Sequence, residues 1–358
     1  MFDLRDYGFT QADFSAAAAW EGCLPGRVVQ DRRNLYTVIC ERGEVPAILK
    51  GSFYYTVQTQ EDLPAVGDFV LLKYNAQGNS AVAGVLPRRS KFSRPDFLGH
   101  EEGYAKNIKE QILAANFDFL FILCSLNGDF NVNRVSRFLT ASWRSGGFPV
   151  VLLTKADLID DWDAPVRAVR KFARDAPVIP VSSKTGIGLD ELGSFLEPAK
   201  TAVFLGSSGV GKSSLLNRLA GEELMEVKEI RENDSKGRHT TTHRQLCRLP
   251  SGALVIDTPG MRELGLWDAG EAVSIAFAEV EEIAAGCRFS DCTHTTEPGC
   301  AVLAALAEGR LSPEQWRNYR KQKREAAFVE DSSAYLRQKT EFHKSLARNG
   351  NIRNKRKN

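Results

Sequence analysis

The sequence predicts a multidomain α/β protein with an N-terminal β-barrel, a mostly parallel α/β domain with flanking helices, and a small helical C-terminal domain. Three observations predict this fold class. Short β-type runs dominate residues 1–95, a strand-like run leads through a glycine-rich loop into a helix-like run at 201–219, and cysteine and histidine residues cluster at 287–300. We therefore expect three domains, at 1–95, 96–270 and 271–358.

The first domain consists of short apolar runs separated by turn residues. The runs predicted as strands are 27–30, 35–40, 46–50, 68–73 and 81–86. Five short strands at this spacing favour a small barrel. Residues 88–94 then read as a basic linker to the second domain, and the sequence leaves open whether these charges meet a partner or stay in solvent.

The first loop of the second domain resembles an element with which GTPases recognise guanine. The apolar run 149–153 ends in Thr154, Lys155, Ala156 and Asp157, which resembles the NKxD element with threonine in place of asparagine. The Asp157 carboxylate can accept hydrogen bonds from two neighbouring guanine donors, which adenine lacks, and Lys155 is expected along the face of the base. Alone, this tetrapeptide is also compatible with an ordinary strand-to-helix turn.

A second loop strengthens the guanine interpretation. The run 177–181 leads into Ser182, Ser183 and Lys184, which resemble the SAK element that contacts the guanine carbonyl through backbone amides. Two base-recognition elements after two strand-like runs indicate that the ligand is a guanine nucleotide.

A complete GxxxxGK[ST] pattern lies between the strand-like run 201–205 and the helix-like run 213–219. Its residues are Gly206, Ser207, Ser208, Gly209, Val210, Gly211, Lys212 and Ser213, and Ser214 follows in the first helical turn. Glycines let the backbone wrap around phosphate oxygens, and the loop amides and the helix N-terminus attract negative charge. Lys212 is expected to reach the β- and γ-phosphates, and Ser213 to offer its hydroxyl to Mg²⁺. A glycine-rich turn without a ligand is the alternative, and the flanking strand and helix argue against it.

The two switch elements follow the phosphate loop. An apolar run ends in a DxxG element, in which Asp257 is expected to hold Mg²⁺ through water and the Gly260 amide to sense the γ-phosphate. Before it, the polar segment 236–242 is typical of a switch loop that Mg²⁺ and the γ-phosphate order. One of its threonines is expected to coordinate the metal, and we assign Thr241, with Thr240 as the alternative.

Hydrolysis needs a group that orients the attacking water. Met261 stands where Ras-like GTPases carry glutamine, so slow intrinsic hydrolysis is expected. His239 is the candidate replacement, because an imidazole can orient water or accept a proton near neutral pH. An exposed loop histidine without that role is the alternative. With Lys212 and Thr241, His239 completes the catalytic assignment.

The elements occur in an unusual order. Both base-recognition loops precede the phosphate loop, whereas ordinary GTPases begin with the phosphate loop. This order predicts a circular permutation, which a compact α/β domain tolerates because its ends often lie close together.

The C-terminal domain carries a metal-binding pattern. Cys287, Cys292, His294 and Cys300 have the spacing C-x4-C-x-H-x5-C. Three thiolates and one imidazole suit tetrahedral Zn²⁺, and four protein ligands leave no position for a substrate, so one structural zinc is expected. Unligated buried thiols are the alternative, and the clustering argues against them.

The permuted nucleotide elements followed by this cluster resemble one family, the ribosome small-subunit-dependent GTPases called RsgA, over about residues 28–316. The resemblance implies an OB-fold for the barrel and a GTP hydrolase that binds the small (30S) ribosomal subunit and its 16S rRNA. It further implies that the protein assists late maturation of the subunit, is stimulated by it, and leaves after hydrolysis to GDP. Mg²⁺ with GTP and one structural Zn²⁺ are the implied cofactors.

Charge and hydropathy agree with an RNA-binding partner and no membrane. The formal net charge is +2, yet from Arg317 onward 13 Lys and Arg stand against 4 Asp and Glu, which suits RNA phosphates. A membrane-surface or merely solubilising role of this basic tail is the alternative. Ser312 and Pro313 predict the start of a basic helix that continues through Arg324. Since no apolar run reaches membrane-spanning length and no signal-peptide pattern is present, we expect a cytoplasmic protein. We also expect it to be a monomer.

Two other functions stay open. A P-loop ATPase with RNA-binding appendages would bind ATP more tightly than GTP. A non-catalytic, GTP-dependent RNA-binding module would bind RNA without hydrolysing GTP, even with ribosomes present.

Overall fold

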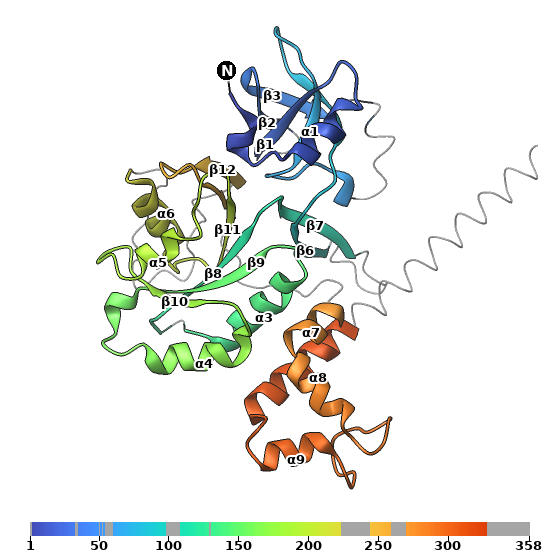
Figure 1. Cartoon of the computed structure of the whole chain (residues 1–358), viewed down its shortest axis with the longest axis vertical. Helices are drawn as coiled ribbons and strands as arrows, with labels where there is room; N and C mark the ends of the chain where they lie inside the picture. The colour runs from blue at the N-terminus through green and yellow to red at the C-terminus, as the bar shows by residue number, and fades with distance from the viewer. Residues whose placement is uncertain are drawn as a thin grey trace, which may run out of the picture. The chain divides into compact units, whose positions relative to one another are not determined.

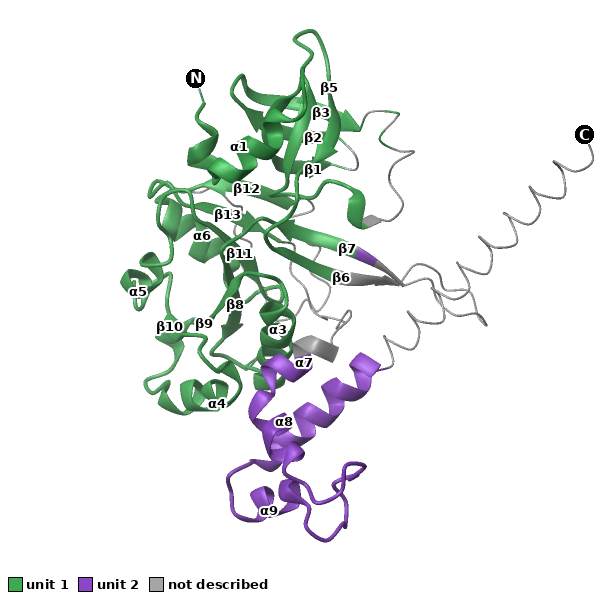
Figure 2. Cartoon of the chain, turned by 45° about the vertical axis from the view of Figure 1, so that its right-hand side comes forward, with its two compact units in different colours: residues 1–94, 111–265 green, residues 95–110, 266–358 purple. Residues whose placement is uncertain are grey.

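The computed structural model of the chain (Figure 1) describes residues 2–32, 35–49, 51, 53, 60–97, 108–128, 130–222, 244–258 and 270–327. The chain divides into two compact units, drawn in green and purple in Figure 2. Unit 1 comprises residues 1–94 and 111–265, and unit 2 comprises residues 95–110 and 266–358. The barrel and the α/β sheet both belong to unit 1.

Five strands near the N-terminus close into a small barrel. They are β1 (Leu24–Arg32), β2 (Leu35–Cys40), β3 (Gly43–Leu49), β4 (Phe69–Lys73) and β5 (Ser80–Val85). Antiparallel pairs join β1 to β2, β2 to β3, β4 to β5 and β1 to β4, and a parallel pair joins β3 to β5. Along β3, buried and exposed residues alternate without a break, as expected for a strand with one face in the core. The predicted strands and the OB-like barrel are confirmed.

Sequence reasoning did not predict the helical segment before the barrel. It consists of η1 (Leu4–Tyr7) and α1 (Gln11–Ala18). The side chain of Thr10 accepts a hydrogen bond from the Asp13 amide, and the Asp13 carboxylate accepts one from the Thr10 amide, so a capping box starts α1. Leu4 and Phe9 from this segment pack with Phe69 in a small core on the barrel.

The α/β sheet of unit 1 has the strand order β10-β9-β8-β11-β13-β12. Its strands are β8 (Phe119–Ser125), β9 (Phe148–Thr154), β10 (Val178–Val181), β11 (Thr201–Leu205), β12 (Arg244–Arg248) and β13 (Leu254–Asp257). All neighbours are parallel except the pair of β12 and β13. The sheet therefore matches the expected mostly parallel domain.

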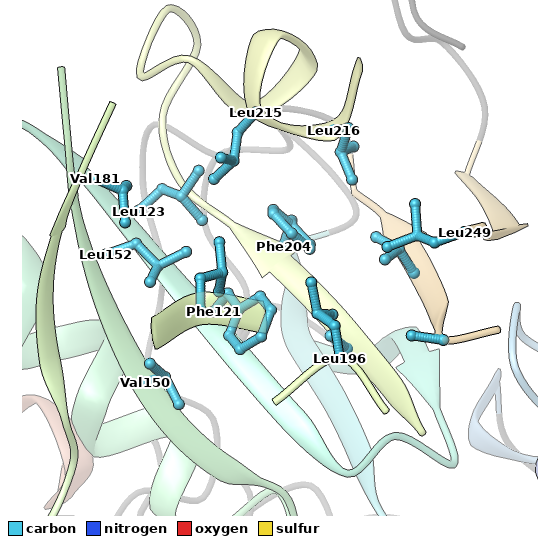
Figure 3. Packing of buried hydrophobic residues seen from close by; sticks show 14 of the residues in the cluster. Phe121, Leu123, Val150, Leu152, Val181, Leu196, Phe204, Leu215, Leu216 and Leu249 are labelled. Carbon is cyan, nitrogen blue, oxygen red and sulfur yellow. The ribbon is translucent and has the colours of Figure 1, made fainter. Parts of the chain in front are cut away.

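Helices cover both faces of this sheet (Figure 1). They are α3 (Val132–Trp143), α4 (Asp163–Ala173), α5 (Leu189–Gly193) and α6 (Lys212–Ala220). Figure 3 shows the core on the α5 and α6 side, where Leu215 and Leu216 of α6 lie over Phe204 and Phe121 of the sheet. The two phenylalanine rings meet edge to face with centroids 5.1 Å apart. This packing fixes where α6 begins relative to the end of β11.

Barrel and sheet are continuous, because β1 pairs with β12 through Gln30 and Asp31. The fully buried Arg27 lies near this junction. Its guanidinium donates to the carbonyls of Tyr7 (2.7 Å), Gly67 (3.1 Å) and Asn116 (2.6 Å) and to Thr201 Oγ1 (3.0 Å). Burial lowers the pKa of Arg27 to about 9, so the side chain stays charged at neutral pH. The strand that leads into the phosphate loop is thereby bonded to the barrel.

The segment 88–94 is more than a linker. Arg88 forms a two-bond ion pair with the buried Asp68 carboxylate, at 2.8 and 2.7 Å. Strand β6 (Lys91–Phe97) begins within the segment and pairs with β7 (Ile108–Ala115). The Arg88 charge is therefore used inside the fold, which its position in a basic run did not indicate.

The described part of unit 2 contains three short helices and a longer helical stretch. They are α7 (Gly270–Ala276), α8 (Ala278–Ala285), α9 (Ala301–Ala307) and the helical residues 313–327. The predicted start of the helix at 313 is confirmed: Ser312 Oγ accepts from the Gln315 amide at 3.1 Å, and Gln315 Oε1 accepts from the Ser312 amide at 3.3 Å. No helix in the described part of the chain has the length and apolar character needed to cross a bilayer.

Candidate functional site

Four predicted nucleotide elements follow strands whose carboxyl ends meet at one edge of the sheet. The strands β9, β10, β11 and β13 run in the same direction, through the parallel ladder that also includes β8. Ligands of open α/β sheets bind outside the carboxyl ends of the strands. Segments far apart in the sequence are thus brought to one place.

The two predicted base-recognition loops contact each other. Ser182 Oγ donates to Asp157 Oδ1 at 2.6 Å and accepts from the amides of Lys184 and Thr185, each at 3.2 Å. Ser182 is buried, whereas Asp157 is partly exposed. Lys155 has a left-handed backbone with φ of 59°, which is uncommon for a residue with a side chain. The serine hydroxyl therefore orients a carboxylate that remains accessible.

Thr154 connects the first base loop to the phosphate loop. Its hydroxyl is buried and donates to the Val210 carbonyl at 2.6 Å. This one contact joins positions that lie 56 residues apart in the chain. Threonine thus supplies a direct bond at the place where the NKxD element carries asparagine.

The phosphate loop turns tightly between β11 and α6. Gly209 and Gly211 have φ angles of 81° and 96°, in the left-handed region that favours glycine. Lys212 Nζ donates to the carbonyls of Gly206 (2.9 Å) and Ser207 (3.3 Å), so its ammonium lies over the beginning of the loop. Burial lowers the pKa of Lys212, and the neighbouring Asp257 partly opposes this shift.

Asp257 ends β13 beside the phosphate loop. It is 3 % exposed, and its Oδ1 atom has no hydrogen-bond partner among the residues that the structure describes. Burial raises the pKa of Asp257 to about 6, although the Lys212 charge pulls it down. A buried carboxylate oxygen without a partner is costly unless a cation or another ligand uses it, so the geometry fits a magnesium site.

The other residues predicted to contact the nucleotide or magnesium lie on the second base loop, the phosphate loop and helix α6. Ser183 and Lys184 lie on the second base loop, Ser208 is exposed on the phosphate loop, and Ser213 and Ser214 lie half-buried in the first turn of α6. Four other residues predicted for the site lie outside the described part of the chain: His239, Thr240, Thr241 and Gly260.

Arg134 is a residue near the phosphate loop that sequence reasoning missed. It belongs to the first turn of α3, and its guanidinium donates to Ser207 Oγ at 3.1 Å. The motif pattern leaves the second loop position free, and the two residues are 73 positions apart. No local sequence signal could have indicated this contact.

The cysteine and histidine cluster of unit 2 comes together as a possible metal centre. One ligand atom from each of Cys287, Cys292, His294 and Cys300 lies within 4.8 Å of the others. His294 Nδ1 is 3.5 Å from the sulfurs of Cys287 and Cys300, which are 3.9 Å apart. Sulfurs on a tetrahedral zinc are about 3.8 Å apart, given Zn–S bonds of about 2.3 Å, so these residues fit such an ion.

The cysteine and histidine cluster is joined to the core of unit 2. The Trp316 ring meets the His294 ring edge to face at 5.4 Å and stacks on Tyr319 at 5.5 Å. The Cys300 sulfur also caps α9 by accepting from the Leu303 amide at 3.5 Å. The cysteine and histidine cluster therefore packs directly against the aromatic side chains of this unit.

The permuted sheet, with a phosphate loop and two joined base loops at one edge, defines a circularly permuted P-loop GTPase. Residues 85–267 match the family described as RsgA GTPase. The chain belongs to the RsgA GTPase family and is a GTP-hydrolysing enzyme, as the sequence motifs predicted.

Relatives resemble the chain over nearly its whole length. It is 43% identical to the small ribosomal subunit biogenesis GTPase RsgA 2 of Lactiplantibacillus plantarum, over 94% of this chain and 93% of that protein. Identity to the small ribosomal subunit biogenesis GTPase RsgA of Streptomyces coelicolor is 42%, over 98% of this chain and 93% of that protein.

Two solved structures share the fold. YjeQ from Thermotoga maritima aligns with a TM-score of 0.61 and 28% identity, over 85% of this chain and 99% of that one. YloQ, described as a circularly permuted GTPase, aligns with a TM-score of 0.56 and 23% identity, over 86% of this chain and 96% of that one. The predicted circular permutation is confirmed.

Proposed function

We propose that this chain binds GTP at the shared edge of β9, β10, β11 and β13, hydrolyses it with Mg²⁺, and uses the cycle in late maturation of the small (30S) ribosomal subunit. The observation that carries the nucleotide assignment is the pair of contacts between separate loops. Ser182 bonds Asp157, and Thr154 bonds Val210, so the base loops and the phosphate loop form one connected surface.

Base selection comes from Asp157. Its carboxylate, oriented by the Ser182 hydroxyl, accepts from the N1 and N2 donors of guanine. Lys155 lies along the face of the base, and the amides of Ser183 and Lys184 meet the guanine carbonyl. Adenine offers an acceptor at N1 and no N2 donor, so ATP would leave the carboxylate unpaired.

Phosphate binding uses the loop from Gly206 to Ser214. Loop amides and the N-terminus of α6 hold the phosphate oxygens. The Lys212 ammonium, which donates to the Gly206 and Ser207 carbonyls without nucleotide, donates to the β- and γ-phosphates when GTP is bound. Bound Mg²⁺ supplies charge neutralisation between these phosphates. Ser213, Asp257 and Thr241 are the residues proposed to hold it.

The hydrolytic assignment rests on the sequence of the switch segments. His239 orients the attacking water in place of the glutamine that Met261 replaces, and the Gly260 amide senses the γ-phosphate. We propose that docking to the ribosomal subunit brings His239 into position for hydrolysis, so that the subunit stimulates turnover.

A basic face on the helix 313–327 supports the proposal that the chain binds the small ribosomal subunit. Arg317, Arg320, Lys321 and Arg324 are exposed on the helix 313–327 at positions i, i+3, i+4 and i+7, and therefore share one face. Such a face suits the phosphates of 16S rRNA. The names of the relatives specify small ribosomal subunit biogenesis. We propose a monomer that works in the cytoplasm, where the subunit matures.

The metal in unit 2 is proposed to be zinc with a structural role. Three cysteine sulfurs and one imidazole nitrogen are the donor set that Zn²⁺ favours, and four protein ligands leave no open position for catalysis. We also propose three domains, at 1–95, 96–270 and 271–358, so that the barrel and the α/β sheet of unit 1 are separate domains.

Phosphate release from GTP and from ATP, with and without 30S subunits, 50S subunits or free RNA, tests the proposal. We expect slow GTP hydrolysis that only 30S subunits accelerate, abolished in Lys212→Ala and retained in the control Lys171→Ala on the exposed surface of α4. ATP preference would refute the base assignment. GTP hydrolysis without stimulation by 30S subunits would refute the ribosomal role alone.

A further inference from the structure

The buried hydroxyl of Ser207 points to an additional residue of the nucleotide site. Ser207 is 6 % exposed and occupies the second position of the phosphate loop, for which the motif requires no particular side chain. Its Oγ accepts a hydrogen bond from the Arg134 guanidinium at 3.1 Å. A charged donor on a neutral hydroxyl gives one of the stronger kinds of hydrogen bond.

The position of Arg134 is set by the fold. Asn131 caps α3 by accepting from the Arg134 amide at 3.0 Å, and buried Phe138 and Leu139 secure the helix on the sheet. Strand β8, which precedes α3, is the parallel neighbour of β11, which precedes the loop. The guanidinium is therefore presented to the loop by a packed helix.

Two positively charged side chains donate hydrogen bonds to residues 206 and 207 at the start of the phosphate loop. Lys212 donates to their two carbonyls, and Arg134 donates to the Ser207 side chain. The inner side is closed by β8, because a side chain at Gly206 would come within 3.0 Å of the Leu123 carbonyl. When the Lys212 ammonium turns to the phosphates, its two bonds to the loop are given up, whereas the Arg134 bond need not change.

We propose that Arg134 is a positioning residue of the nucleotide site, which acts through Ser207 to keep the start of the phosphate loop in its binding conformation while Lys212 engages the phosphates. The inference rests on the proposed nucleotide site. Arg134 also places a second positive charge beside this loop, and the experiment separates that direct effect from the effect through Ser207.

A double-mutant cycle with Arg134→Met and Ser207→Ala tests the assignment. The dissociation constants of a fluorescent GDP and of a slowly hydrolysed GTP analogue are measured, together with single-turnover hydrolysis and thermal unfolding. Each single variant is expected to bind both nucleotides about tenfold more weakly, as loss of one charged hydrogen bond predicts. The double variant should bind no more weakly than either single variant, because both remove the same contact.

Two further variants provide controls. Arg134→Lys keeps a cation and a donor and should recover part of the affinity. Arg167→Met removes an exposed arginine from α4 and should bind nucleotide like the wild type. A purely structural role of Arg134 would lower the unfolding temperature without changing the dissociation constants, and this result would overturn the inference.

Three other results of this experiment would refute either the role of Arg134 or the nucleotide site itself. If the losses in Arg134→Met and Ser207→Ala multiply in the double variant, the arginine does not act through Ser207 and the inference is wrong. If Lys212→Ala binds nucleotide like the wild type, the proposed nucleotide site itself is wrong. If Lys212→Ala loses binding while Arg134→Met does not, only the role of Arg134 is refuted.

Discussion

Replacing Asp257 by asparagine should stabilise the protein when nucleotide and magnesium are absent. The Asp257 carboxylate is buried, its Oδ1 has no partner among the described residues, and its pKa is raised from an ordinary value of 3.8 to about 6. The folded chain therefore retains a proton that the unfolded chain releases at lower pH. Above pH 6 the folded state carries an unfavourable charge that asparagine lacks.

The magnitude follows from the two pKa values. Between about pH 4 and pH 6 the native state binds more protons at this site than the unfolded state, so the contribution of Asp257 to the free energy of unfolding falls as pH rises. The full cost at pH 7.5 is about 3 kcal/mol, and at pH 4.5 it is about 1 kcal/mol. Asp257→Asn should be more stable than the wild type by these amounts.

Urea unfolding of both proteins in magnesium-free, nucleotide-free buffer at the two pH values measures this difference. Taking the difference between variant and wild type removes any effect of pH on the cysteine and histidine cluster of unit 2. Asp175→Asn, at an exposed position before β10, is the matched control and should change stability little at either pH. The reasoning is refuted if Asp257→Asn is no more stable than the wild type at pH 7.5, or if its advantage is equal at both pH values. Magnesium-dependent hydrolysis should be lost in the same variant.

Three other substitutions have defined outcomes. Asp157→Asn should weaken GTP binding at least about 100-fold, because the carboxylate that we propose to pair with guanine is lost. It should gain affinity for XTP, whose C2 carbonyl can accept from the new amide. His239→Ala should slow single-turnover hydrolysis about 100-fold with an unchanged dissociation constant for GTP. Cys292→Ala should reduce zinc from about one ion per chain to a small fraction in metal analysis, and change the emission of Trp316, which contacts the ligand His294.

For each of these three substitutions, one result would contradict the prediction. An Asp157→Asn protein that still prefers GTP over XTP would remove Asp157 from base recognition. Equal hydrolysis rates for His239→Ala and the wild type would leave the histidine as a loop residue. Full zinc content in Cys292→Ala would show that the cluster does not hold the ion with this ligand.

Elements carried by contiguous residues were predictable from the sequence. The strand-like run 201–205 is strand β11, and the Ser312 capping box begins the helix 313–327. In each case the physical requirement is local: a short apolar run between turn residues, or a cap three residues from its partner. The cysteine and histidine cluster was also predictable, because its four residues lie close together in the sequence and a short loop can bring them around one ion.

Local patterns did not indicate the contacts of side chains whose partners lie far away in the sequence. Arg88 stands in a basic run that looks solvated, yet it pairs with buried Asp68, because the barrel strand that follows Asp68 lies beside it in space. The short capped helix α1 was missed, because eight residues with many alanines have no clear apolar periodicity.

The sequence by itself determined the class of this protein, since phosphate binding, guanine selection and metal binding each need particular residue types at short spacing. Only the tertiary structure decided how these parts cooperate. The contacts of Thr154 with Val210, Arg134 with Ser207 and Arg27 with Thr201 span 56, 73 and 174 residues. They depend on which strands are neighbours in the sheet and in what register, and this arrangement arises from burial of the whole core rather than from any local pattern.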